Sequence, residues 1–290
     1  MNKTTDTLVD DIYAMMESKD ADPSVDVEAE IEKFGENVKA LMRTEFGREK
    51  RVDKRTLRLS NVGRTDRFLW NVVNGTAKEK IEPHTYVKFM YGHLVEELLL
   101  FLTRMSGHTV TDEQKQCEVE GIRGSMDCKI DGIVTDVKSA SSFGFKKFKE
   151  GKILRDDPFG YVDQIKAYAY SEGETQIGWL AIDKTVGHLT YLKYDLADPE
   201  FKVDMEFNGT IADRIKYLKE MVKNPEPEAV CHKPKPDGKS GNMQLAMGCS
   251  YCQYKQHCYP KLRLFNYSYQ PKYLCEVVKE PNVQELKLSD

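Results

Sequence analysis

Apolar residues recur every three or four positions over several stretches of the chain, and this spacing predicts helices. The helices are expected as a pair within residues 1–50, then at 84–105, 157–170 and about 207–223. Apolar and polar residues alternate in other stretches, which predicts strands at 116–123, 124–138, 176–183 and 188–194. The order helix, three strands, helix and two strands is typical of a mixed α/β core.

Residues that start and end secondary structure refine this order. Pro83 stands just before the long 84–105 helix, where proline suits a helix start. Ser60 is expected to cap a short helix with an aromatic face. Residues 233–248 are rich in Pro, Gly and Lys and are expected to form an irregular connection. The polar residues 279–290 are expected to be a frayed tail.

The pair Asp131-Gly132 lies between alternating apolar residues, which predicts a tight hairpin turn. On the second strand, Asp136 and Lys138 then share one face, and the first strand brings Asp127 beside them. Two carboxylates suit a hard cation such as Mg²⁺ or Mn²⁺, and the lysine would orient a water or offset phosphate charge. A charged strand with a solvated face carries the same Asp-x-Lys pattern, so this interpretation needs support from other residues.

The long helix supplies a further acid. Gly92 and Glu96 are four residues apart and therefore lie on one face of the helix. A glycine within a helix costs about 1 kcal/mol, which indicates close packing at Gly92. Glu96, rather than its neighbour Glu97, is therefore expected to face inward. His93 is interpreted as a surface or supporting residue rather than a metal ligand.

Basic residues follow the second hairpin strand and are expected to form a basic loop. They are Lys146, Lys147, Lys149, Lys152 and Arg155. Such runs are usually solvated, but the position directly after the carboxylate strand favours phosphate contact. An earlier set of arginines has the same two interpretations, with the solvated one as the default: Arg55, Arg58, Arg64 and Arg67.

Seven cysteines are present, and four of them are spaced as metal ligands. These four are Cys231, Cys249, Cys252 and Cys258. A CxxC pair with two further cysteines indicates a site in which four thiolates hold zinc or an iron–sulfur cluster. The others are interpreted as bystanders, with Cys128 pointing into the core: Cys117, Cys128 and Cys275.

Composition limits the remaining possibilities. The 290 residues are 40% hydrophobic, enough for a substantial core, and 43 Lys and Arg against 47 Asp and Glu give a net charge of −4. Contact with nucleic acid must therefore come from a local basic patch. No apolar run is long enough to span a membrane and no signal peptide is evident, so a cytoplasmic protein without a membrane partner is expected.

Together these motifs resemble the PD-(D/E)XK nucleases of the RecB-like exonuclease group, which includes CRISPR-associated RecB-like nucleases and phage recombination exonucleases. The resemblance covers about residues 57–260. It rests on Gly92-x-x-x-Glu96, Gly124-x-x-Asp127 with Asp136-Val137-Lys138, Gln164-x-x-x-Tyr168 and the terminal CxxC-x5-C. The general look is that of a phage-encoded member, which would act in the host cytoplasm.

The resemblance implies an α/β fold with a restriction-endonuclease-like core, a central mixed β-sheet flanked by helices. This core would span 84–225, between an N-terminal helical region (1–83) and a C-terminal four-cysteine metal-cluster region (226–290). The implied activity is metal-dependent hydrolysis of DNA in replication, recombination or repair. An exonuclease is favoured, and a structure-selective endonuclease or a catalytically silent DNA-binding scaffold is the alternative.

Individual roles also follow from the resemblance. The implied catalytic residues are, in chain order, Glu96, Asp127, Asp136, Lys138, Gln164 and Tyr168. Asp127 and Asp136 would bind Mg²⁺ or Mn²⁺ with the Val137 carbonyl, and Glu96 would complete the site or hold a second ion. Lys138 would position the attacking water or stabilise the charge of the transition state. Gln164 and Tyr168 would orient the lysine and the DNA end.

The cysteine pattern departs from the family in one respect. Relatives with an iron–sulfur cluster usually take one cysteine from the segment before the long helix, near Thr65 here, and this chain has none before Cys117. Cys231 is the local replacement, which leaves both a [4Fe-4S] cluster, the favoured choice, and Zn²⁺ open. The expected partners are DNA and single-strand-binding, recombination or replication proteins. Cleavage polarity, strand preference and oligomeric state do not follow from the sequence.

Overall fold

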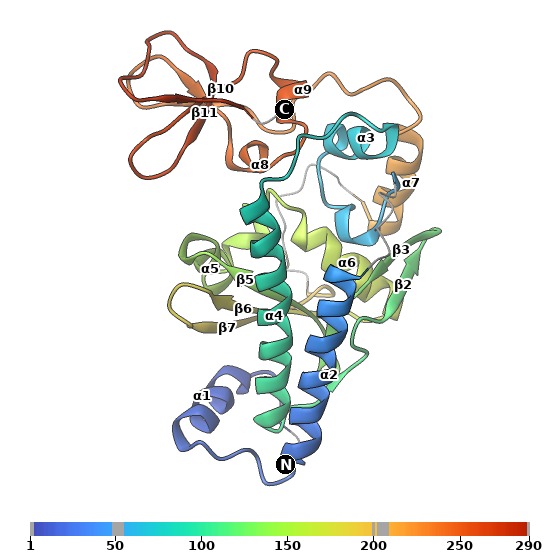
Figure 1. The fold of residues 1–290 in the computed structure, drawn as a ribbon. Helices are drawn as coiled ribbons and strands as arrows, with labels where there is room; N and C mark the ends of the chain where they lie inside the picture. The colour runs from blue at the N-terminus through green and yellow to red at the C-terminus, as the bar shows by residue number, and fades with distance from the viewer. Residues whose placement is uncertain (1–2, 48–54, 199–200, 202–208, 289–290) are drawn as a thin grey trace.

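The computed structural model describes residues 3–47, 55–198, 201 and 209–288, and a mixed sheet of five strands forms the centre of this part of the chain (Figure 1). In spatial order the strands are β1 (Val110–Thr111), β4 (Cys128–Ile130), β5 (Ile133–Ala140), β6 (Gln176–Asp183) and β7 (Leu189–Asp195). Only β5 and β6 run parallel, while the other neighbours pair antiparallel. A parallel pair needs a crossover connection, which is formed here by α5 (Ser142–Lys149), η2 (Lys152–Leu154) and α6 (Tyr161–Glu172).

Helices cover both faces of this sheet. Val137 of β5 packs in a cluster with side chains of α1 (Leu8–Ser18) and α4 (Pro83–Met105). Val134, three residues earlier and therefore on the opposite face, belongs to the larger cluster with side chains of α5 and α6. The prediction of a mixed α/β protein with a central sheet flanked by helices is thus confirmed. In the described ranges, no helix is both long and apolar enough to cross a membrane.

The long helix α4 has a second helix alongside it. Figure 1 shows α2 (Val27–Phe46) running next to α4, and the rings of Phe34 and Phe101 lie 5.1 Å apart between the two helices. Arg104, which is only 5% exposed, donates hydrogen bonds to Glu30 of α2 at 2.5 Å and to Glu113 at 3.2 Å. These contacts hold the N-terminal helical pair against the core.

The predicted turn at Asp131-Gly132 is present. Both residues have positive φ, 48° and 85°, as a tight hairpin turn requires, and β4 pairs with β5 on either side of it. The strand expected at 116–123 is wrong, because it is itself a hairpin of β2 (Gln116–Val119) and β3 (Ile122–Ser125). Glu120 and Gly121 at its turn also have positive φ, 49° and 76°, a turn signal that the alternation concealed.

Two predicted element boundaries are wrong. Ser60 does not cap a helix, because it lies inside the short 3₁₀ helix η1 (Leu59–Asn61), and Thr65 precedes α3 (Asp66–Asn74) instead. The helix expected to start at Phe207 is α7 (Ile211–Met221), whose cap Thr210 accepts a hydrogen bond from the Asp213 N–H at 3.2 Å. Phe207 itself lies outside the described residues.

The basic residues after β5 do not form a loop, because they lie mainly on α5 and η2. Ser141 caps α5 by accepting a hydrogen bond from the Gly144 N–H at 3.3 Å. Phe145 and Phe148 are buried three residues apart and anchor the helix in the core. This apolar pair is the helical signal that the surrounding lysines obscured.

The C-terminal part of the chain forms a second sheet, which Figure 1 shows beyond the N-terminal end of α4. Its order is β12 (Glu285–Leu286), β10 (Arg263–Phe265), β11 (Lys272–Glu276), β9 (Met243–Gln244) and β8 (Lys235–Pro236). Residues 233–248 are mostly irregular, as expected, apart from β8, β9 and the start of α8 (Met247–Ser250), whereas the expectation of a frayed tail at 279–290 is wrong for the described residues. Arg263 fixes the tail by ion pairs to Glu280 and Glu285, each at 2.6 Å.

Candidate functional site

Asp136 lies at the centre of a polar group on β5. One of its oxygens, Oδ1, accepts a hydrogen bond from Lys138 Nζ at 2.6 Å and another from Gln164 Nε2 of α6 at 3.2 Å. The other oxygen, Oδ2, is buried and has no hydrogen-bond partner among the described residues. The side chain is 1% exposed. Asp136 is therefore held in place by one oxygen while the second has an unused capacity to bind.

Asp127 reaches the same place from the other strand of the hairpin. It stands immediately before β4, and its Oδ2 accepts a hydrogen bond from the Val137 N–H at 2.8 Å. A carboxylate fixed by a backbone donor of β5 has little freedom to turn away. The hairpin thus sets two aspartates next to each other, as the alternation along the strands predicts.

Glu96 completes the group from α4. Burial and, after it, the charge of Asp127 raise the pKa of Glu96 to about 8. Gln114 Nε2 donates a hydrogen bond to Glu96 Oε1 at 2.9 Å. The neighbouring Glu97 instead accepts a hydrogen bond from Asn37 of α2 at 2.9 Å. The two adjacent acids therefore have different surroundings. Glu97 bonds to α2, whereas Glu96 lies close enough to the aspartates for their charges to raise its pKa.

Lys138 is the positive charge within this group. Burial raises the pKa of Asp136, Lys138 opposes that shift, and Asp127 adds to it. Burial disfavours the charged form of Lys138, but Asp136 and then Asp127 raise its pKa overall. Three carboxylates beside one ammonium leave an excess of negative charge in a poorly solvated place. A divalent cation would relieve that repulsion.

The expectation about Gly92 is wrong, and a different glycine has the close contact. A Cβ on Gly92 would lie 3.7 Å from Ser139 Oγ, an ordinary contact distance. A Cβ on Gly124 would lie 2.7 Å from Leu59 Cβ and 3.2 Å from Tyr168 Cε1. Gly124 therefore lets β3 approach the tyrosine that the sequence assigned to the site.

Sequence reasoning missed one residue beside the lysine. The ring of Tyr161 lies 5.1 Å from Lys138 Nζ, within the range of a cation–π contact. Tyr161, Gln164 and Tyr168 follow the i, i+3, i+7 spacing of one helix face. The same helical spacing, followed three residues back from Gln164, would have added Tyr161 to the predicted site residues.

The predicted DNA-binding residues differ in their surroundings. Lys147 is 11% exposed and forms an ion pair with Asp156 at 2.7 Å, and Lys152 pairs with Glu150 at 2.5 Å. Three others are exposed: Lys146, Lys149 and Arg155. His93 is exposed on α4 as well.

The four predicted cysteine ligands influence one another. Burial and then the charges of Cys231 and Cys252 raise the pKa of Cys249 to about 12. Burial likewise raises the pKa of Cys252 to about 11, although its sulfur accepts a hydrogen bond from the Tyr254 N–H at 3.4 Å. Cys258 is partly buried and also affects Cys249. Of the presumed bystanders, Cys128 is fully buried in the core, as predicted.

The segment before α3 also reaches the cysteines. Arg64, Thr65 and Cys231 line a pocket of about 430 Å³. Burial lowers the pKa of Arg64, whereas the charges of Cys252 and Cys231 act in the opposite direction. The place where the resembling nucleases carry a further cysteine is therefore next to this group.

The carboxylates and the cysteines are two candidate donor sets for metals. Within residues 3–47, 55–198, 201 and 209–288, no three Cys, His, Asp or Glu side chains are arranged to enclose a metal ion. The chemistry of the donors nevertheless fits. The buried free oxygen of Asp136 beside two further carboxylates suits a hard cation, and four thiols suit zinc or an iron–sulfur cluster.

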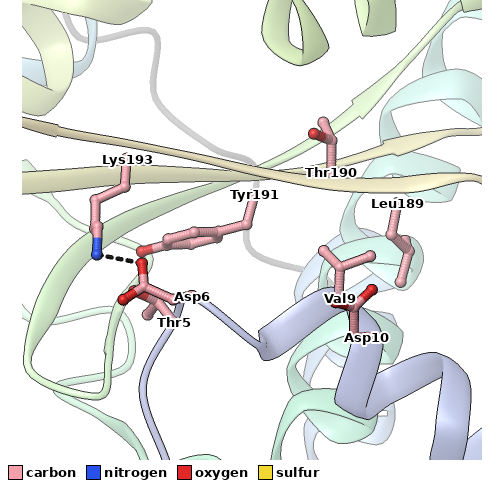
Figure 2. Close-up of a pocket in the computed structure, with 8 residues that line it drawn as sticks. All are labelled: Thr5, Asp6, Val9, Asp10, Leu189, Thr190, Tyr191 and Lys193. Atoms are coloured by element: carbon pink, nitrogen blue, oxygen red, sulfur yellow. Dashed lines mark hydrogen bonds and ion pairs between the residues drawn. The ribbon is translucent and has the colours of Figure 1, made fainter.

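A second pocket lies elsewhere in the molecule. Figure 2 shows it between α1 and β7, where Lys193 and Asp6 form an ion pair at 2.5 Å. Its volume is about 270 Å³, and none of the predicted site residues lines it. This pocket belongs to the packing of the N-terminal helix on the sheet edge.

No family model and no curated protein matches this sequence. Among solved structures, the one described as SSO0001 is 14% identical, with a TM-score of 0.40, covering 78% of this chain and 95% of the other. An alkaline exonuclease (LHK-Exo) from Laribacter hongkongensis is 15% identical, with a TM-score of 0.33 and coverage of 58% and 90%. Its complex with dAMP is 14% identical, with a TM-score of 0.34 and coverage of 59% and 91%. TM-scores this low do not establish a shared fold.

Proposed function

We propose that this protein is a divalent-metal-dependent deoxyribonuclease, with exonuclease activity favoured. One observation carries the proposal: Asp136 is buried, held by Lys138 and Gln164 through one oxygen, and has no hydrogen-bond partner among the described residues at the other. A buried carboxylate oxygen without a partner is costly in a folded protein. Here the charge of Asp127 acts on it, and the charges of Asp127 and Asp136 both act on Glu96, so a divalent cation would offset that cost.

The proposed ligands are Glu96, Asp127 and Asp136, with the Val137 carbonyl. A bound Mg²⁺ or Mn²⁺ would polarise the phosphoryl oxygen and lower the pKa of a bound water. Asp127 is kept in position by the Val137 N–H at 2.8 Å.

Lys138 and the helix α6 have supporting roles. The charges of Asp136 and Asp127 keep the lysine protonated, so it serves to orient the water or to stabilise phosphate charge, not to accept a proton. Gln164 fixes Asp136 at 3.2 Å. Tyr168 is 1% exposed and packs against Gly124 of β3, so its proposed part is to hold Gln164 and β3 in place.

The cysteine group is proposed to hold a [4Fe-4S] cluster or Zn²⁺ with a structural role. Its residues lie on a short segment that includes α8 (Met247–Ser250) and α9 (Lys255–Cys258). Glu79, just before α4, forms an ion pair with Lys255 and accepts a hydrogen bond from the Gln256 N–H at 2.9 Å. A metal there would fix this segment to the start of α4.

The test is degradation of linear DNA labelled at either end, single-stranded or double-stranded, with Mg²⁺ or Mn²⁺. Wild-type protein should degrade DNA only with metal, and Asp136→Asn should not. The order in which the labels are released gives the polarity, and cleavage of closed circular DNA would identify an endonuclease instead. Absence of hydrolysis on linear, nicked and branched DNA would reject the enzyme and favour a DNA-binding scaffold.

A further inference from the structure

A row of aromatic rings leads from the cysteine segment to the candidate active site. The ring of Tyr251 lies 6.3 Å from that of Phe159, and Phe159 lies 5.7 Å from Tyr161. Tyr161 in turn lies 5.1 Å from the amino group of Lys138. The row therefore begins at the surface, where Tyr251 is 73% exposed, and ends at the reactive group.

Tight turns fix the backbone at the first two rings of this row, Tyr251 and Phe159. Tyr251 lies inside the CxxC turn, which is closed by a hydrogen bond from the Cys252 N–H to the Cys249 carbonyl at 3.0 Å. Asp157 accepts hydrogen bonds from the N–H groups of Phe159 at 3.2 Å and Gly160 at 2.9 Å. Each turn orders the backbone that carries its ring, so binding needs little further ordering of the backbone at Tyr251 and Phe159.

Positive charge accompanies the rings. The guanidinium carbon of Arg64 lies 4.1 Å from the ring centre of Phe68 and 5.6 Å from that of Phe159. Alternating aromatic and cationic side chains suit nucleic acid, because bases stack on the rings and phosphates attract the cations. Within a duplex both faces of each base are already covered by neighbouring pairs. Only the terminal pair of a duplex has an uncovered face, whereas every unpaired base can present a face to a tyrosine.

We propose that Tyr251 and Phe159 stack unpaired bases of a DNA strand and guide that strand to Lys138 and Asp136. This inference rests on the proposed nuclease function and narrows it to substrates with an unpaired end. Tyr251 is a positioning residue in this scheme, because it touches the strand some distance from the reacting phosphate. The cysteine segment would thereby contribute directly to substrate choice, since it carries the outermost ring.

The test measures DNA binding without hydrolysis, using Asp136→Asn protein as the common background. Single-stranded oligonucleotides containing 2-aminopurine report stacking through quenched fluorescence, and a blunt duplex of the same sequence is the comparison. Tyr251→Ala should weaken single-strand binding about tenfold and relieve the quenching. Tyr251→Phe should retain both properties because the ring remains. Tyr269→Ala is the matched control, since Tyr269 is a 94% exposed tyrosine between β10 and β11.

An oligonucleotide with abasic positions separates stacking from a general loss of affinity. The protein with Tyr251 should bind it more weakly than the intact strand, whereas this difference should be smaller for the Tyr251→Ala protein, in which only Phe159 remains to stack. Unchanged single-strand binding by Tyr251→Ala, an equal loss on duplex, or an equal loss in Tyr269→Ala would each overturn the inference. If one of these results is found and wild-type protein still hydrolyses DNA, the nuclease proposal is retained and only the stacking proposal is rejected. If wild-type protein neither binds nor hydrolyses DNA, both proposals fall.

Discussion

Two groups of acidic side chains lie in poorly solvated places of this protein. They are the carboxylate group (Glu96, Asp127 and Asp136) and the cysteine group (Cys231, Cys249, Cys252 and Cys258). Both gather acidic side chains where burial and mutual repulsion oppose ionisation. The carboxylates come from α4, from β5 and from the residue just before β4, and hydrogen bonds from the sheet or from α6 fix the two aspartates. Three of the cysteines come from one segment with two four-residue helices, and Cys231 precedes β8.

The two groups also differ in their counter-charge. Lys138 contacts Asp136 directly at 2.6 Å. The cations that act on the thiols are Arg64 and Arg67, which lower the pKa of Cys252 and Cys258 against the larger effect of burial. We therefore expect the core to hold its carboxylates without a metal, whereas the cysteine segment is expected to depend on the metal that it is proposed to bind. A metal should therefore affect chemistry at the first group and stability at the second.

Asp136→Asn gives the largest expected effect. The amide oxygen can still accept hydrogen bonds from Lys138 and Gln164, so the fold should be retained while the charge is lost. Hydrolysis should fall by about a hundredfold or more, because the metal contributes several kcal/mol of charge stabilisation. The measurement is the initial rate on end-labelled DNA, with the melting temperature recorded in parallel.

Asp183→Asn is the matched control for that variant. Asp183 is also buried on a strand of the central sheet, and it accepts a hydrogen bond from the Thr185 N–H at 2.9 Å, away from the carboxylate group. Its activity should stay near that of wild type. Equal rates for Asp136→Asn and wild type would remove Asp136 from the site.

Changing Cys249 and Cys252 together to Ser should lower the stability of the protein more than its hydrolysis rate, the opposite of Asp136→Asn. Metal binding by thiolates contributes folding free energy, so the double variant should lose its bound iron or zinc and melt about 5 °C or more below wild type. The hydrolysis rate at low temperature should change less. Metal analysis and thermal unfolding, with Cys275→Ser beside them, provide the check. A wild-type melting temperature with wild-type metal content would show that these thiols are unrelated to any cluster.

The amino-acid sequence predicts more of the carboxylate group than of its surroundings, for physical reasons. Strand alternation and an Asp-Gly turn are local rules, so they suffice to place Asp127, Asp136 and Lys138 together. The contact of Gly124 with Tyr168 depends on how β3 lies on α6, which no local pattern encodes. The ion pair of Lys147 with Asp156 also depends on tertiary structure, because Lys147 lies on a helix where a loop was expected.

In the cysteine segment, spacing identifies the thiols but not the sheet that supports them. Strands of two to five residues, such as β8 and β12, are too short to show alternation. β12 forms because its backbone groups pair with β10, which is distant in sequence, and β8 pairs with β9 across the connection 237–242. The ring contact of Tyr251 with Phe159 is likewise a product of tertiary packing.

Two glycines test how tightly the carboxylate group is supported. Gly124→Ala forces a methyl group against Leu59 and Tyr168, and such overpacking costs about 1–3 kcal/mol. Gly92→Ala meets an ordinary contact and should stabilise α4 by up to about 1 kcal/mol, because glycine is a poor helix former. Chemical denaturation of both variants measures these free energies of unfolding. Equal effects would mean that the contacts of Gly124 do not constrain the site.

The smallest effect is expected from the basic residues of α5. Lys146 and Lys149 are exposed and lie three residues apart on one face of the helix, whereas Lys147 is engaged with Asp156. If the exposed pair contacts phosphates, changing both to Ala should reduce the salt dependence of single-strand binding by about 1.4 in the log–log slope. Lys147→Ala should alter the slope less, because its charge is already neutralised. Titration of DNA binding from low to high salt distinguishes the two variants. A larger change for Lys147→Ala than for the double variant would mean that Lys147 leaves Asp156 when DNA binds, and that the helix face assigned here to DNA is the wrong one.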